Sequence, residues 1–176
     1  MPRLNVVDPA TAEGRAKELF EGPLKGMHAN IFKGIANSGA ALDFYVQASG
    51  ALKNGLLTGA EREVIQLTIA QANDCDYCLA AHTAIGKMEG LSEDQTVAAR
   101  KGTLDDAKLA ALSKFAGTLH EKRGWASDDD LAAFKSAGYT DGHVPEVIAG
   151  IALAYFTNYF NHTHDTEVDF PAAPKI

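Results

Sequence analysis

The chain has 176 residues, of which 46% are hydrophobic and 22% charged, and its formal net charge is −7 at pH 7. This length and composition predict a single globular domain over residues 1–176 with a hydrophobic core of its own. The acidic charge argues against nucleic-acid binding, which needs clustered Lys and Arg. No apolar run reaches the roughly 18 residues of a membrane span.

The start of the sequence, Met1 to Pro9, has no apolar core of the kind that a signal peptide carries. We therefore expect a cytoplasmic protein that does not enter the membrane. In a reducing cytosol, two closely spaced cysteines are more often catalytic or metal-binding than structural.

Apolar residues recur at helical spacing along the chain, and no segment alternates as a strand would. The prediction is an all-α fold of about eight helices. Thr11 is expected to cap the first helix. The patterns that begin at Thr58, Ser92 and Ser127 predict helix starts, the first two as capping boxes.

The last helix is expected to begin at Thr140 or Asp141 and to end before His162, where the sequence becomes irregular. Its predicted buried stripe consists of Val144, Val147, Ile148, Ile151, Tyr155 and Tyr159.

Both cysteines of the chain lie in one C-x-x-C motif, Cys75 and Cys78, with His82 one helical turn further on. We expect Asp74 to cap a helix that begins at Cys75. Residues 75, 78 and 82 then share one face. The two sulfurs are close enough for a disulfide, the helix N-terminus favours a thiolate, and His82 can serve as the base.

Glu63 lies on the preceding predicted helix. If the two helices pack antiparallel around a turn at Asp74, Glu63 is eleven residues before the turn and His82 eight after it. At about 1.5 Å per residue, the offset is roughly 4–5 Å, which a Glu side chain can span. Glu63 is therefore a candidate to orient or charge the imidazole.

Glu63, the segment CDYCLAAHTAIGK and the capping Thr58 resemble the alkylhydroperoxidase D family, within the carboxymuconolactone decarboxylase-like superfamily. The later segment NYFNHTHDTEVDFP resembles the peroxidase-related branch of that family. The resemblance implies an AhpD-like helical fold in a homotrimer or homohexamer that reduces hydroperoxides without a bound cofactor or metal. It implies that Cys78 attacks the peroxide, Cys75 resolves it as a disulfide, and Glu63 and His82 relay protons. The implied electron donor is a dithiol, in studied members a lipoyl adaptor protein.

The sequence departs from the best-known members at Tyr77, where they carry a histidine. A phenol with a pKa near 10 is a poor base at neutral pH.

Other interpretations are open. The cysteines could be two buried small residues, or they could bind zinc together with His82 and Glu63. The protein could also be a decarboxylase-type lyase in which the cysteines have no redox role. A zinc-binding or redox-sensing protein without catalytic activity is the non-enzymatic alternative.

Overall fold

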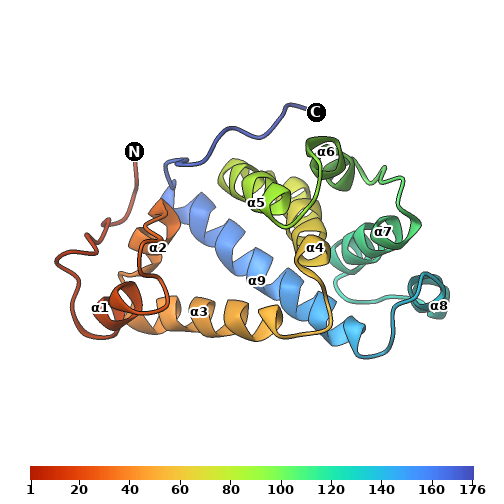
Figure 1. The fold of residues 1–176 in the computed structure, drawn as a ribbon, viewed down its shortest axis with the longest axis horizontal. Coiled ribbons are helices and arrows are strands. Elements are labelled where there is room, and N and C mark those ends of the chain that lie inside the picture. The colour runs from red at the N-terminus through yellow and green to blue at the C-terminus, as the bar shows by residue number, and fades with distance from the viewer.

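The computed structural model describes residues 1–176 and contains nine α-helices and no strand (Figure 1). The all-α prediction is confirmed, with one helix more than the approximate number expected. The helices are α1 (Gly14–Glu21), α2 (Asn30–Ile35), α3 (Gly39–Lys53), α4 (Gly59–Ala72), α5 (Asp76–Met88), α6 (Glu93–Lys101), α7 (Ala107–Glu121), α8 (Asp128–Ser136) and α9 (His143–His164).

Three predicted helix starts are capping boxes, at Thr58, Ser92 and Ser127. In each, the cap side chain accepts a hydrogen bond from the amide three residues later, and the side chain of that later residue accepts one from the cap amide. These bonds satisfy amides that the first turn of a helix leaves free. The prediction for the first helix is wrong, because α1 begins at Gly14 without a side-chain cap and Thr11 lies before it.

The core consists of two hydrophobic clusters, and α4 lies between them. One cluster joins α4 to α6, α7, α8 and α9 and includes Leu67 and Phe115. The other joins α1, α2 and α3 to the first turns of α5 and includes Leu42, Cys75 and Cys78. The C-x-x-C motif therefore lies within the core of the protein.

α9 crosses the middle of the molecule, between α3 on one side and the α4–α5 hairpin on the other (Figure 1). Its buried face begins with Val147, Ile151 and Ala154 and continues with the polar residues Asn158 and Asn161. These positions follow one another at helical spacing, so the buried stripe changes from apolar to polar where it approaches α5.

The predicted stripe of this helix is therefore partly wrong. Ile148 and Tyr159 are 50% and 57% exposed. The helix starts at His143, later than expected, and continues to His164, so its last turn includes residues that were expected to be irregular. No helix, including α9, combines the length and the apolar character needed to cross a membrane.

Residues 165–176 form an extended segment that passes α5 toward α6 (Figure 1). Arg100 of α6 fixes its far end by donating to the carbonyl oxygen of Pro174 at 2.6 Å, and it also bonds Gln71 of α4 at 3.0 Å. The C-terminal segment is thereby attached to α6 and, through Arg100, to α4.

Candidate active site

The turn between α4 and α5 sets the position of the motif. Asn73 ends α4, and Asp74 adopts a left-handed conformation with φ of 53°, which aspartate tolerates better than most residues. Cys75, not Asp74, is the N-cap of α5, so the prediction that Asp74 caps this helix is wrong. The left-handed residue reverses the chain, and this leaves Cys75 at the cap position.

Cys75 and Cys78 form a disulfide, with their Cα atoms 5.3 Å apart. The backbone amide of Cys78 donates a hydrogen bond to Cys75 Sγ at 3.4 Å. Each cysteine is only 1% exposed. The spacing predicted that the sulfurs could bond, and the structure confirms this pairing.

Glu63 of α4 and His82 of α5 form a largely buried pair across the α4–α5 hairpin. His82 Nδ1 lies 2.7 Å from Glu63 Oε2, and the side chains are 17% and 11% exposed. The predicted contact across the antiparallel α4–α5 hairpin is confirmed. Because an ionised carboxylate can only accept, Nδ1 carries the proton in this bond, and the lone pair of a neutral imidazole is then on Nε2.

Gly86 of α5 faces α4 and the loop that follows α5. A Cβ atom at this position would lie 3.6 Å from Glu63 Cβ and 3.2 Å from a methyl carbon of Leu91. The contact with Glu63 would be an ordinary one and that with Leu91 a tight one, so the small residue lets the loop after α5 pack closely against the helix.

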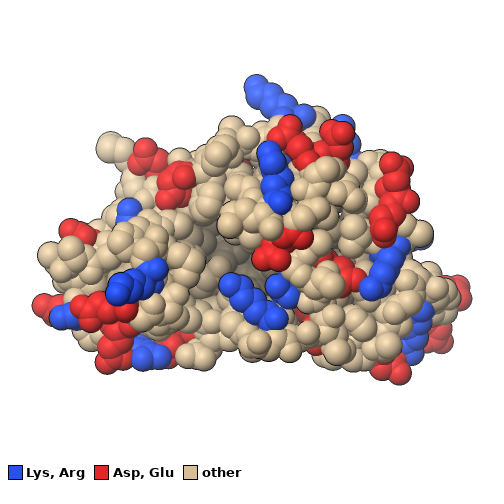
Figure 2. Space-filling view, viewed as in Figure 1, with Lys and Arg blue, Asp and Glu red and all other residues tan.

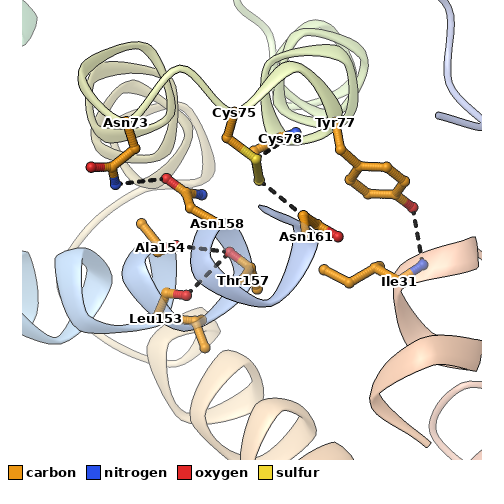
Figure 3. Close-up of a disulfide and its surroundings, with 10 residues drawn as sticks. All are labelled: Ile31, Asn73, Cys75, Tyr77, Cys78, Leu153, Ala154, Thr157, Asn158 and Asn161. Atoms are coloured by element: carbon orange, nitrogen blue, oxygen red, sulfur yellow. Dashed lines mark hydrogen bonds between the residues drawn. A yellow bond between two sulfur atoms is a disulfide. The ribbon is translucent and has the colours of Figure 1, made fainter. Parts of the chain in front are cut away.

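Two asparagines of α9 approach the motif from the opposite side (Figure 3). Asn161 Nδ2 donates to Cys78 Sγ at 3.2 Å, and Asn158 Oδ1 accepts from Asn73 at 2.9 Å. In this disulfide form the side-chain partner of Cys78 is therefore Asn161, and no hydrogen bond joins the sulfur to His82. Sequence reasoning missed both asparagines; their spacing of three residues on one helix face was the available signal.

Tyr77, which replaces the histidine of the resembled family, points away from the sulfurs. Its hydroxyl donates to Asp169 at 2.8 Å and accepts from the amide of Ile31 at 3.3 Å (Figure 3 shows the second bond). The ring of Phe170 packs edge-on against it. Burial and the bond to Asp169 raise the pKa of Tyr77 far above its ordinary value. The residue therefore attaches the C-terminal segment to α5 and stays neutral.

A second phenol lies near the Glu63–His82 pair. Burial and the negative charge of Glu63 raise the pKa of Tyr45 to about 12. Neither Tyr45 nor Tyr77 is thus ionised at neutral pH, which leaves His82 as the basic side chain of this region. In the space-filling view, the face of the protein is hollowed near its centre, between α3 and α5, with charged side chains along the right and lower edges of the hollow (Figure 2).

The arrangement does not resemble a metal centre. The two cysteines are bonded to each other and His82 is bonded to Glu63. No three His, Cys, Asp or Glu side chains of the chain are gathered as ligands for one ion. The four residues proposed as zinc ligands therefore form two separate pairs.

The family model described as "Carboxymuconolactone decarboxylase family" matches residues 39–121, a segment that contains the motif, Glu63 and His82. No curated protein is similar enough to the chain to match it.

Solved structures share the fold. A protein of Ralstonia eutropha JMP134, described as an alkylhydroperoxidase AhpD core and an uncharacterized peroxidase-related protein, is 22% identical with a TM-score of 0.85, over 96% of this chain and 92% of that one. An uncharacterized peroxidase-related protein of Silicibacter sp. TM1040 is 21% identical with a TM-score of 0.79, over 94% and 89%. The debrominase Bmp8, in complex with 2,3,4-tribromopyrrole, is 16% identical with a TM-score of 0.76, over 96% and 94%.

At these identities the structural matches establish the fold, and the family model covers the segment that carries the motif. The chain therefore has the fold of the AhpD core, and its residues 39–121 match the carboxymuconolactone decarboxylase family model.

Proposed function

We propose that this protein is a thiol peroxidase that reduces alkyl hydroperoxides or hydrogen peroxide through Cys75 and Cys78. The observation that carries the proposal is a C-x-x-C disulfide at a helix N-terminus, next to the buried Glu63–His82 pair with its 2.7 Å contact. A cysteine pair that bonds reversibly supplies two electrons, and the imidazole–carboxylate pair supplies a route for protons.

In the first step, the Cys78 thiolate attacks the terminal oxygen of the hydroperoxide. An S–O bond forms and the O–O bond breaks, so the sulfur is oxidised to a sulfenic acid and the peroxide is reduced to an alcohol or to water. His82, oriented by Glu63 through Nδ1, takes the thiol proton before attack and returns a proton to the departing oxygen.

In the second step, the Cys75 thiol attacks the sulfenic sulfur of Cys78, and water leaves as the disulfide forms. A dithiol reductant, such as a lipoyl group on an adaptor protein, then reduces the disulfide and becomes a disulfide itself. The proposed setting is the cytoplasm and the proposed assembly is a homotrimer or homohexamer, as the family resemblance implies.

The assignment of Cys78 as the attacking residue is supported by its place on the same helix face as His82, one turn away. Cys75 is the N-cap, seven residues before His82, and its sulfur accepts a hydrogen bond from the Cys78 amide. In the Cys75→Ser variant, peroxide should leave Cys78 as a sulfenic acid that dimedone traps. Cys78→Ser should consume no peroxide.

The deciding experiment is a titration of freshly reduced protein with hydrogen peroxide and with cumene hydroperoxide. We expect one equivalent of peroxide to be consumed for each pair of thiols lost, and an unchanged rate in Cys78→Ser would refute the proposal. His143→Gln is the matched control for His82→Gln, because the only hydrogen-bond partner of the His143 side chain is Thr140, just before α9.

Two other activities are distinguished by assays of their own. A lyase activity that survives the double Cys75→Ser/Cys78→Ser change would favour a decarboxylase-type enzyme over a peroxidase. Because a debrominase shares this fold, release of bromide from a brominated pyrrole, with no consumption of peroxide, would indicate reductive dehalogenation instead.

A further inference from the structure

The sulfur of Cys78 has a hydrogen-bond donor from a different helix. Asn161 of α9 donates from Nδ2 to Cys78 Sγ at 3.2 Å, and the two residues are 4% and 1% exposed (Figure 3). A polar side chain this deeply buried costs stability unless it makes hydrogen bonds. The Cys78 sulfur is therefore one of the groups with which the buried Asn161 side chain makes its hydrogen bonds.

The helix N-terminus does not supply such a donor to Cys78. The amide of Cys78 points at the other sulfur, Cys75 Sγ, at 3.4 Å. A thiolate buried without a donor is disfavoured relative to the thiol. Cys78 therefore needs a donor from outside its own helix, and Asn161 is in that position.

The charged and titratable neighbours do not provide this donor. Tyr77 on α5 gives its hydroxyl proton to Asp169 of the C-terminal segment. His82, also on α5, gives its Nδ1 proton to Glu63 of α4. On α9, the side chain that contacts the sulfur is uncharged.

Asn161 is also held in place before the disulfide opens. Asn158, one turn earlier, accepts from Asn73 at 2.9 Å and so attaches α9 to the turn that leads into Cys75. Asn161 Oδ1 has no partner in the disulfide form. The same amide thus offers a donor to a thiolate and an acceptor to the hydroxyl of a sulfenic acid.

We infer that Asn161 is a catalytic residue whose side-chain amide donates a hydrogen bond to the Cys78 thiolate and increases the ionised fraction of Cys78 at neutral pH. The catalytic meaning of this inference rests on the proposed peroxidase function. The effect on Cys78 ionisation does not, and it can be measured without any peroxide.

The test uses the Cys75→Ser background, in which Cys78 is the single thiol, and follows its alkylation by iodoacetamide across pH with mass spectrometry. Hydrogen bonds to charged groups are strong enough that Asn161→Leu should raise the pKa of Cys78 by about one to two units. At pH values below the pKa of Cys78 in the parent protein, alkylation should be about 10- to 100-fold slower in the variant than in the parent. Thr157→Val is the matched control, since Thr157 is 6% exposed on the same helix and its hydroxyl donates only to the carbonyl oxygens of Leu153 and Ala154.

A pKa of Cys78 that is the same in Asn161→Leu and in the parent protein would overturn the inference, and so would an equal rise in Thr157→Val. If Asn161→Leu does not fold, the test is instead an NMR titration that follows the side-chain NH₂ resonances of Asn161 in the ¹⁵N-labelled parent protein. They should titrate with the midpoint of Cys78 alkylation, and resonances that do not move would overturn the inference. A protein that passes this test but consumes no peroxide would contradict only the proposed function.

Discussion

Reduction of the Cys75–Cys78 disulfide should weaken the fold only slightly. The two residues are separated by three positions, so the cross-link closes a loop of four residues. In the chain-entropy description, a loop this short restricts the unfolded chain by about 1.9 kcal/mol at 25 °C. Both cysteines belong to a buried apolar cluster whose other members are unaffected by reduction. We therefore predict that the reduced chain remains folded and loses about 2 kcal/mol, or roughly 4–8 °C in melting temperature.

The measurement is urea unfolding followed by far-UV circular dichroism, with and without dithiothreitol. The Cys75→Ser/Cys78→Ser variant is the control, because dithiothreitol should leave its unfolding curve unchanged. Loss of more than about 5 kcal/mol, or unfolding on reduction, would show that the disulfide is a structural cross-link. A redox pair that cycles in catalysis has to leave the fold intact in both states, so that result would also contradict the proposed mechanism.

Three further predictions concern single side chains. Glu63→Gln should slow single-turnover peroxide consumption by about 10²-fold, within the range for loss of general acid–base assistance, because the amide cannot hold His82 in the required protonation state. The exposed Glu93→Gln is the control, and equal rates in the two variants would contradict the relay. Tyr77→Phe should leave that rate within about threefold but lower stability to urea by about 1–2 kcal/mol through lost hydrogen bonds; a large loss of rate would mean that the phenol takes part in the chemistry. Burial lowers the pKa of His164 below its ordinary 6.5, so the unfolded chain binds the proton first and stability should fall as the pH drops below 6.5. The slope should not exceed about 1.4 kcal/mol per pH unit, and His164→Asn should flatten it in urea unfolding measured from pH 8 to 5; an unchanged slope would refute this assignment.

Local patterns predicted much of the fold because helix starts are decided by neighbouring residues. The capping boxes at Thr58 and Ser92 need only a hydroxyl and a side chain three positions later, and both are present. The Glu63–His82 contact was also predictable, since it depends on the rise of two helices and on one tight turn. Their catalytic role stays a prediction.

The residues that were missed depend on contacts between distant parts of the chain. A rule that seeks an apolar stripe placed Ile148 and Tyr159 inside, although both are half exposed. The rule left out Asn158 and Asn161, because it does not register that an asparagine can be buried when another helix supplies its partner. Such partners become visible only when α9 is placed against α4 and α5.

The role of Tyr77 was hidden for a similar reason. Comparison with the resembled family described Tyr77 only as a replacement for a histidine. The hydroxyl is instead bonded to Asp169, 92 residues further along the chain. Sequence spacing over such a distance gives no indication of the partner.

The depth of the disulfide imposes different steric requirements on the two halves of the proposed cycle. Cys75 and Cys78 are each 1% exposed. A small peroxide needs only a narrow passage to Cys78, whereas a dithiol on another protein must bring its own sulfur to about 2.05 Å from a buried one. The first turn of α5 must therefore open locally before a large reductant can react. In kinetic terms, turnover with a protein donor should respond to low, non-denaturing urea, while oxidation by hydrogen peroxide should be insensitive to it.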